Sequence, residues 1–254
     1  MLLHAFNDAP DKPVILLLHG GGLSWWSVQG VASYLTDEFC VVAPIIDGHG
    51  ENAEETFETI EVCANKLIRL IDEQFGGKVY ALCGLSLGAQ ITVEVLSQRP
   101  DIARHVVIES ALVVRMPLVG ALIAPTYHMM YGLIKKRWFS KYQARVLKLP
   151  NELFELYWRD TACMKKQSLI NLGRSNANYP LKSQISAATA KTLVLAGDKE
   201  PGFMLKSARL LHEAIPKSKL VIIKGLGHGE LSLCSPRRYA ELLREVFLEE
   251  TINF

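Results

Sequence analysis

The chain has 254 residues, of which 49% are hydrophobic and 21% are charged, and its formal net charge is +2. This is the composition of an ordinary globular protein, and α/β folds of this length commonly form a single domain. A net charge this small gives no strong field for gathering nucleic acid. We therefore expect one large core and no nucleic-acid partner.

The cysteines and the apolar stretches restrict the cellular setting. The five cysteines are odd in number, scattered, and not spaced as metal-ligand pairs: Cys40, Cys63, Cys83, Cys163 and Cys234. Such thiols predict a reduced, cytoplasmic protein. The N-terminal apolar stretch is too short for a signal sequence. The most apolar later stretch, residues 112–125, is interrupted by Arg115 and Pro117, and about 20 apolar residues are needed to cross a bilayer, so no transmembrane helix is expected.

Six short aliphatic runs predict strands. They cover residues 14–20, 40–46, 78–84, 105–110, 192–198 and 219–225. Their hydrophobicity is continuous rather than alternating, which is typical of strands buried on both faces of a parallel sheet. Apolar residues at helical spacing over 58–75 and 207–215 predict two of the intervening helices. The fold class is therefore α/β, with a doubly wound, mostly parallel sheet.

A long insertion separates the fourth and fifth of these runs. About 80 residues lie there, where a crossover needs only about a dozen. We predict a helical cap over residues 111–180, inserted into a core made of residues 1–110 and 181–254. Proline and glycine are expected to break its helices at Pro117, Pro125, Pro150, Gly173 and Pro180.

The predicted cap is rich in aromatic residues. Eight occur between residues 127 and 158: Tyr127, Tyr131, Trp138, Phe139, Tyr142, Phe154, Tyr157 and Trp158. Most of them are expected to pack the cap against itself, because aromatic side chains dominate cores. The others could line an apolar pocket.

A serine lies between a predicted strand and a predicted helix. Gly84-Leu85-Ser86-Leu87-Gly88 follows the run at residues 78–84 and precedes a helical pattern. A glycine two residues before and two after the serine relieves crowding in a sharp turn that exposes the hydroxyl at the sheet edge. Ser86 is the candidate nucleophile, although an isolated match of this kind can also be a helix cap.

A serine nucleophile needs a base and a group that orients the base. His228 follows the last predicted strand on a glycine-rich loop, and Asp198 ends the preceding one. Both lie where parallel strands end, which is where ligands bind in open α/β sheets. We predict His228 as general base and Asp198 as the orienting carboxylate. Glu109, at the end of the strand before, remains the alternative acid.

The oxyanion of a tetrahedral intermediate needs two donors. The backbone N–H of Leu87, the residue after the nucleophile, is the first candidate. Gly21, in the turn His19-Gly20-Gly21-Gly22, is the second, with Gly22 as the alternative. A simple tight turn into a helix would also explain these glycines.

Taken together, these motifs resemble those of the α/β-hydrolase superfamily, in the branch of serine esterases with a helical cap after the sixth family strand. The matching motifs are 19–22, 47–50, 84–88, 197–198 and 227–228, in the family's order. The resemblance implies hydrolysis of carboxylic esters or thioesters of small to medium apolar acyl groups through a Ser-His-Asp triad and an acyl-enzyme. Only about a dozen residues precede the family's third strand, so the segment MLLHAF is a candidate for an earlier one.

Other functions stay open. Ligand receptors with slow turnover and carbon–carbon bond hydrolases share this fold and triad, so fold alone does not decide between them. His19, Asp47 and His49 could be considered a metal cluster, but their spacing matches no zinc motif. The sequence supports no metal and no cofactor, and it leaves the oligomeric state undetermined.

Charge is unevenly distributed in the predicted cap. No Asp or Glu occurs from residue 110 to 150, which contains Arg115, Lys135, Lys136, Arg137, Lys141, Arg145 and Lys148. An acidic run of Glu51, Glu54, Glu55, Glu58 and Glu61 could face it. Solvated helix faces are one interpretation. The other is a basic rim that attracts an anionic substrate, such as an acyl-coenzyme A, or a membrane surface.

Overall fold

The computed structural model describes residues 1–248 and contains one seven-stranded sheet, in the order β1-β3-β2-β4-β5-β6-β7. The strands are β1 Leu2–Ala5, β2 Val14–Leu18, β3 Cys40–Ile45, β4 Val79–Leu85, β5 Ala103–Glu109, β6 Lys191–Gly197 and β7 Ser218–Ile223. β1 pairs antiparallel with β3, and the other neighbours are parallel. The predicted mostly parallel sheet is confirmed, and the segment MLLHAF does supply an additional strand.

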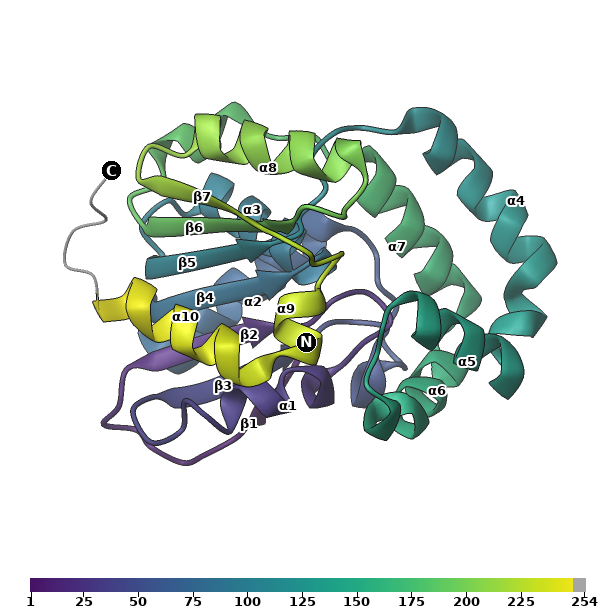
Figure 1. Ribbon diagram of the computed structural model, residues 1–254, viewed down its shortest axis with the longest axis horizontal. Coiled ribbons are helices and arrows are strands. Elements are labelled where there is room, and N and C mark those ends of the chain that lie inside the picture. The colour runs from purple at the N-terminus through teal and green to yellow at the C-terminus, as the bar shows by residue number, and fades with distance from the viewer. Residues whose placement is uncertain (249–254) are drawn as a thin grey trace.

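Helices cover both faces of this sheet and extend beyond one end of it (Figure 1). The α-helices are α1 Gln29–Ala32, α2 Ile60–Phe75, α3 Leu87–Gln98, α4 Pro117–Ile134, α5 Arg137–Val146, α6 Phe154–Cys163, α7 Lys166–Asn178, α8 Gly202–Ala214, α9 Glu230–Cys234 and α10 Pro236–Leu248. Short 3₁₀ helices are η1 Trp25–Ser27, η2 Gly50–Asn52, η3 Asn151–Leu153 and η4 Ser183–Ala187. In residues 1–248 we find no helix that is both long and apolar enough to traverse a bilayer.

The core has two layers because successive strand residues point to opposite faces. Leu16 and Leu18 of β2 join a cluster with side chains from α2, α3 and α8. Ile15 and Leu17 join a second cluster with side chains from α1 and α10. Burial of both faces explains the continuous hydrophobicity of the strand sequences.

The four helices α4–α7 lie together in the chain between β5 and β6, and in space beyond the carboxyl ends of the strands (Figure 1). Two of the expected helix breaks are wrong. α4 continues through Pro125 and α7 continues through Gly173. Proline lacks only one backbone donor, and Pro125 lies on the exposed side of α4, where water can solvate the carbonyl that loses its partner.

Gly173 has a packing role instead. A Cβ at Gly173 would lie 2.9 Å from a methyl group of Ile123 on α4, and a Cβ at Gly120 of α4 would overlap the side chain of Asn178. The two glycines let α4 and α7 approach each other closely. α7 in turn is anchored to the rest of the protein, since the Ser168 hydroxyl accepts a hydrogen bond from the backbone N–H of Phe57.

Candidate active site

Ser86 occupies a strained turn between β4 and α3. Its φ is +52° and its ψ is −108°, a combination rarely adopted by residues with a side chain. The turn is held because the Ser86 N–H donates to the Glu109 carbonyl at 2.9 Å and the Ser86 carbonyl accepts from the Gln90 N–H at 2.9 Å. Such strain persists where the surrounding structure imposes it, and it is frequent at functional sites.

The two flanking glycines are required by close backbone contacts. A Cβ on Gly84 would lie 2.5 Å from the carbonyl carbon of Gly88, and a Cβ on Gly88 would lie 2.6 Å from the carbonyl oxygen of Leu18. Backbone atoms cannot move aside as a flexible side chain can. The GLSLG pattern is therefore explained by sterics at this turn.

His228 reaches Ser86 from the loop that follows β7. Its Nε2 lies 3.0 Å from the Ser86 Oγ, within hydrogen-bond distance. The loop that carries it contains Gly229, which has a φ of +65° and whose Cβ, if present, would lie 2.8 Å from Leu85. The structure therefore brings His228 and Ser86 together, as the sequence predicts.

The carboxylate that contacts His228 differs from the one predicted from the sequence. Glu200, and not Asp198, contacts the imidazole: its Oε2 lies 3.0 Å from Nδ1 of His228. The Asp198 side chain is exposed, and its Oδ1 accepts from the Gly225 N–H at 2.7 Å. Asp198 thus closes the loop that leads to His228 but does not orient the ring.

The turn after β6 explains this exchange. The Asp198 N–H still bonds to Ile223 at the end of β7, and the chain then turns tightly, with the Glu200 N–H donating to the Gly197 carbonyl. A Cβ on Gly197 would overlap the carbonyl oxygen of Leu226. The turn brings the carboxylate two residues later back beneath the histidine loop.

Glu200 is set up as an anion. Its side chain is 0% exposed, and its Oε1 accepts from the Gly197 N–H and from the Ser110 hydroxyl, each at 2.8 Å. Burial alone would raise the pKa of Glu200, but the hydrogen bonds from His228, Gly197 and Ser110 outweigh it and hold the pKa below its ordinary value. An ionised carboxylate at this position can both orient and stabilise a protonated imidazole.

Glu109, the other sequence candidate, is buried behind this group. Its Oε1 accepts a long hydrogen bond of 3.4 Å from the Ser232 N–H, and its Oε2 has no hydrogen-bond partner within residues 1–248. Burial raises the pKa of Glu109 to about 7. Its carboxyl contacts the helix after His228 rather than the ring itself.

The residues expected to supply the oxyanion donors border the same cavity as the serine. Gly21, Gly22 and Leu87 all line the same cavity as Ser86. Leu87 is the first residue of α3, where helix N–H groups have no intrahelical acceptor. A Cβ on Gly21 would lie 3.8 Å from the Cβ of Leu87, so the two peptides are close neighbours.

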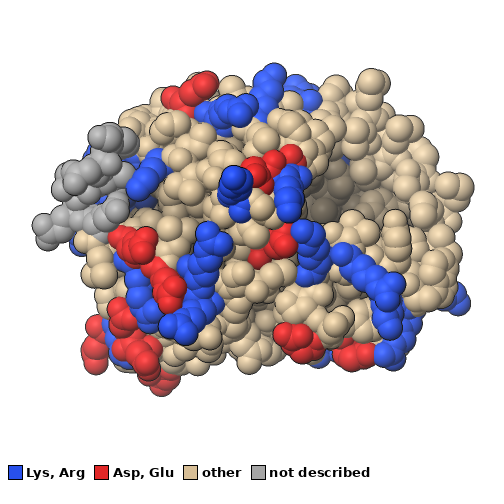
Figure 2. Space-filling model, viewed as in Figure 1, with Lys and Arg blue, Asp and Glu red and all other residues tan. Residues whose placement is uncertain are grey.

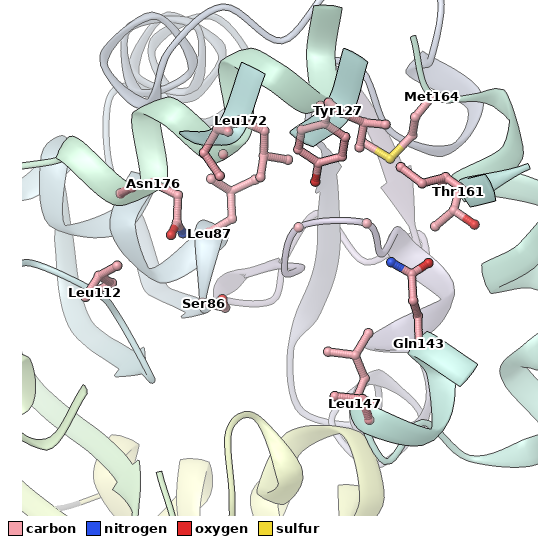
Figure 3. A pocket seen from close by; sticks show the side chains of 18 of the residues that line it. Ser86, Leu87, Leu112, Tyr127, Gln143, Leu147, Thr161, Met164, Leu172 and Asn176 are labelled. Atoms are coloured by element: carbon pink, nitrogen blue, oxygen red, sulfur yellow. The ribbon is translucent and has the colours of Figure 1, made fainter. Parts of the chain in front are cut away.

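Ser86 borders a large, mostly apolar cavity of about 720 Å³ (Figure 3). Four of the eight aromatic residues noted in the sequence line it, namely Tyr127, Phe139, Tyr142 and Tyr157. Leu112 and Leu172 extend the apolar wall. Figure 3 shows the Tyr127 hydroxyl and the Gln143 amide pointing toward the space in front of Ser86. The cavity size is typical of small-molecule sites.

His19 and His49, which precede Ser86 in the sequence, form hydrogen bonds with backbone groups. His19 Nε2 accepts from the Ile46 N–H at 3.2 Å, and His49 Nδ1 lies 3.0 Å from the Asp47 carbonyl oxygen. Burial lowers the pKa of His19 to about 3 and that of His49 to about 4. The Asp47 carboxylate is paired with Lys66 at 2.5 Å. Within residues 1–248 no group of three or more His, Cys, Asp or Glu side chains is arranged to hold a metal ion.

The geometry defines a class: a mostly parallel α/β sheet that carries a strained serine, a histidine and a buried carboxylate in line at its carboxyl edge is the arrangement of hydrolases of this fold. The chain belongs to the alpha/beta hydrolase family, whose model matches residues 15–242. It is 23% identical, over 97% of its length, to an uncharacterized protein of Mycobacterium tuberculosis (strain ATCC 25618 / H37Rv), of which 78% is covered.

Solved structures share the fold at low sequence identity. A thermophilic esterase from Thermogutta terrifontis superposes with a TM-score of 0.76 and 18% identity, covering 96% of this chain and 91% of the esterase. The enol-lactonase from Burkholderia xenovorans LB400 superposes with a TM-score of 0.80 and 16% identity, covering 98% of this chain and 96% of the lactonase. At these identities the similarity establishes the fold.

Proposed function

We propose that the protein is a serine hydrolase that cleaves carboxylic esters or thioesters of small to medium apolar acyl groups. The observation that carries the proposal is the continuous hydrogen-bonded series from Ser86 through His228 to Glu200, at the wall of an apolar cavity. The names of two structural relatives, an esterase and an enol-lactonase, both denote cleavage of ester bonds.

In the proposed mechanism, the Ser86 Oγ attacks the carbonyl carbon while His228 Nε2 accepts the hydroxyl proton. Glu200 stabilises the resulting imidazolium. The N–H groups of Leu87 and Gly21 would donate to the oxyanion. Collapse of the tetrahedral intermediate breaks the C–O or C–S bond, and His228 returns the proton to the leaving group. Water, deprotonated by His228, then hydrolyses the acyl-enzyme and regenerates Ser86.

We further propose that residues 111–180 form a cap that provides the acyl pocket. Most of the cavity wall comes from this segment, whereas the serine, Gly21 and Leu87 come from the sheet domain. A hydrogen-bonded link joins the two parts near the histidine, since Glu230 accepts from both Lys148 and the Gly227 N–H at 2.7 Å. The cap would therefore set substrate size while the sheet edge performs the chemistry.

A panel of p-nitrophenyl esters and acyl thioesters, assayed with the wild type and with Ser86→Ala, tests this function. Hydrolysis by the wild type and its loss in the variant are expected. Binding of acyl compounds without turnover by the wild type would instead indicate a receptor.

A further inference from the structure

The helix α4 is unusual for a helix at a protein surface. It contains no Asp, Glu, Lys or Arg over Pro117–Ile134, and its side chains are apolar or aromatic apart from Thr126 and His128. A helix of this composition normally lies in a core or in lipid. Yet its outer face is open: Leu118 is 82% exposed, Leu122 is 64% exposed and Met129 is 80% exposed.

These three residues lie on one stripe of the helix. Their spacings of four and seven residues place them within about 40° of one another around the axis, at 3.6 residues per turn. The opposite side of α4 is held by α7, through the close contact at Gly173. The exposed stripe is therefore the side of the helix that the described residues, 1–248, leave uncovered. Three neighbouring large apolar side chains form a patch, whereas apolar residues exposed singly are ordinary on protein surfaces.

Positive charge borders this apolar face. Arg115 precedes α4, and Lys135, Lys136 and Arg137 follow it, continued by Lys141 and Arg145 on α5. Figure 2 shows Lys and Arg side chains gathered along α5 beside a hollow, and a surface almost free of charged side chains over α4. Of the acidic run, Glu51 and Glu54 pair with Arg159 and Lys165, which lie outside the basic stretch.

Most of these cations are left without a carboxylate. Within residues 1–248, only Arg137 and Lys148 of the basic stretch form ion pairs, with Glu155 and Glu230. Arg115, Lys136, Lys141 and Arg145 form none there. An apolar helix face bordered by unpaired cations is complementary to the surface of an anionic bilayer, whose acyl region takes the apolar side chains and whose headgroups take the charges.

Exposed apolar side chains also border the mouth of the candidate active site, where α4 contributes Val119, about 100° around the helix from Leu118. Val119 of α4, Tyr142 and Val146 of α5, and Phe203 of α8 all line the cavity and are themselves exposed. Exposed apolar side chains therefore surround the entrance of the pocket that ends at Ser86.

We propose that the outer face of α4, with the cations at its ends and on α5, docks the protein on the surface of an anionic phospholipid bilayer. The pocket mouth, on the flank of α4, then lies beside the bilayer surface. A second step, which rests on the proposed hydrolase function, is that the substrates are lipid-soluble esters that enter from the bilayer. Docking itself requires no catalysis and is tested separately.

Flotation with lipid vesicles tests the docking. The full-length protein, as wild type and as Ser86→Ala, is mixed with vesicles of phosphatidylcholine alone or of phosphatidylcholine with phosphatidylglycerol. Both proteins should float with the anionic vesicles and much less with the neutral ones, and about 0.5 M NaCl should weaken this binding because it screens exposed charges.

Two double variants separate the apolar and the electrostatic contributions. Leu122→Ser with Met129→Ser, and Lys136→Glu with Lys141→Glu, should each lower the bound fraction at least about tenfold. Their hydrolysis of a water-soluble short-chain ester should be unchanged, because none of these residues lines the cavity. Leu248→Ser on α10 and Lys217→Glu in the turn before β7, both at exposed positions, are single-residue controls and should float like the wild type.

The proposal is overturned if the wild type floats with neither kind of vesicle, or if the variants and controls float equally. A wild-type dimer that dissociates in the Leu122→Ser, Met129→Ser variant without lipid would assign this face to a second copy and also overturn it. If the wild type binds the vesicles but hydrolyses no ester, the hydrolase function is rejected and the docking proposal stands.

Discussion

The carboxylate of Glu200 lies 3.0 Å from Nδ1 of His228, on the side of the ring opposite Ser86. The contact fixes which imidazole nitrogen faces the serine, because a proton on Nδ1 leaves Nε2 free to accept one. Asp198, two residues earlier, hydrogen-bonds the histidine loop instead. This relationship makes the identity of the triad acid directly testable.

Glu200→Gln should lower kcat by at least about a hundredfold, because an amide can neither stabilise the imidazolium nor fix the productive tautomer. Asp198→Asn is the matched control and should change kcat by less than about tenfold, since its partner is a backbone N–H. Steady-state kinetics on one soluble ester decides the matter. A larger loss in Asp198→Asn than in Glu200→Gln would restore the acid expected from the sequence.

Ser110 positions Glu200 without touching the substrate site. Its hydroxyl donates to Glu200 Oε1 at 2.8 Å, and its φ is +58°. A hydrogen bond to a charged group is worth roughly 1.5–3 kcal/mol, so Ser110→Ala should lower kcat about tenfold or more, with KM nearly unchanged.

Ser110→Gly separates this effect from backbone strain. Glycine suits a positive φ but also lacks the hydroxyl. Ser110→Gly should therefore have the same low kcat as Ser110→Ala, and its unfolding temperature should equal or exceed that of Ser110→Ala. Full activity in Ser110→Gly would show that the hydroxyl has no positioning role.

Glu109 should make the protein less stable as pH rises. Its carboxyl is buried and its pKa is raised to about 7, so the folded protein holds a proton that the unfolded chain loses near the ordinary value of 4.5. The contribution of Glu109 to the free energy of unfolding is therefore fully present below about pH 4.5 and is lost as pH rises through 7.

Glu109→Gln should flatten this dependence. By linkage, the variant should lose less stability than the wild type between about pH 5 and pH 8, by up to about 3 kcal/mol. Urea unfolding at a series of pH values measures the difference. Parallel wild-type and variant curves would mean that Glu109 is already ionised in the folded protein.

The acyl pocket predicts a chain-length profile. Each methylene buried in the cavity contributes up to about 0.8 kcal/mol, so kcat/KM should rise up to about fourfold per methylene from acetyl to medium-chain esters. Leu172→Trp should shift the optimum to shorter chains, because Leu172 lies within 3.5 Å of the Cβ position of Gly21. Leu248→Trp, at an exposed position of α10, should keep the wild-type profile. A flat or falling wild-type profile would reject an apolar acyl pocket.

Much of this architecture could be predicted from local sequence. The strands are recognisable because burial on both faces makes them continuously apolar, and Ser86 is recognisable because its turn tolerates only glycine at positions 84 and 88. Strand β1 was an inference from the family's strand count, because Leu2–Ala5 is mostly exposed and carries little hydrophobic signal.

The triad acid could not be chosen from the sequence in the same way. Three carboxylates lie at or just after the ends of two neighbouring strands. The choice among Glu109, Asp198 and Glu200 depends on how far the tight turn at Gly197 rotates the chain. The available signal was a second acidic residue within the same loop, two positions after Asp198. Helix continuity through Gly173 likewise depends on the tertiary contact between α4 and α7, which overrules local propensity.

Covalent labelling tests the central claim most directly. A fluorophosphonate reacts with a serine whose hydroxyl is activated by a base, so incubation of the folded protein followed by peptide mass spectrometry should find the label on Ser86 and on no other serine. His228→Ala should abolish the labelling. Folded wild-type protein with an unmodified Ser86, or with the label on a different serine, would contradict the proposed nucleophile and the hydrolase function built on it.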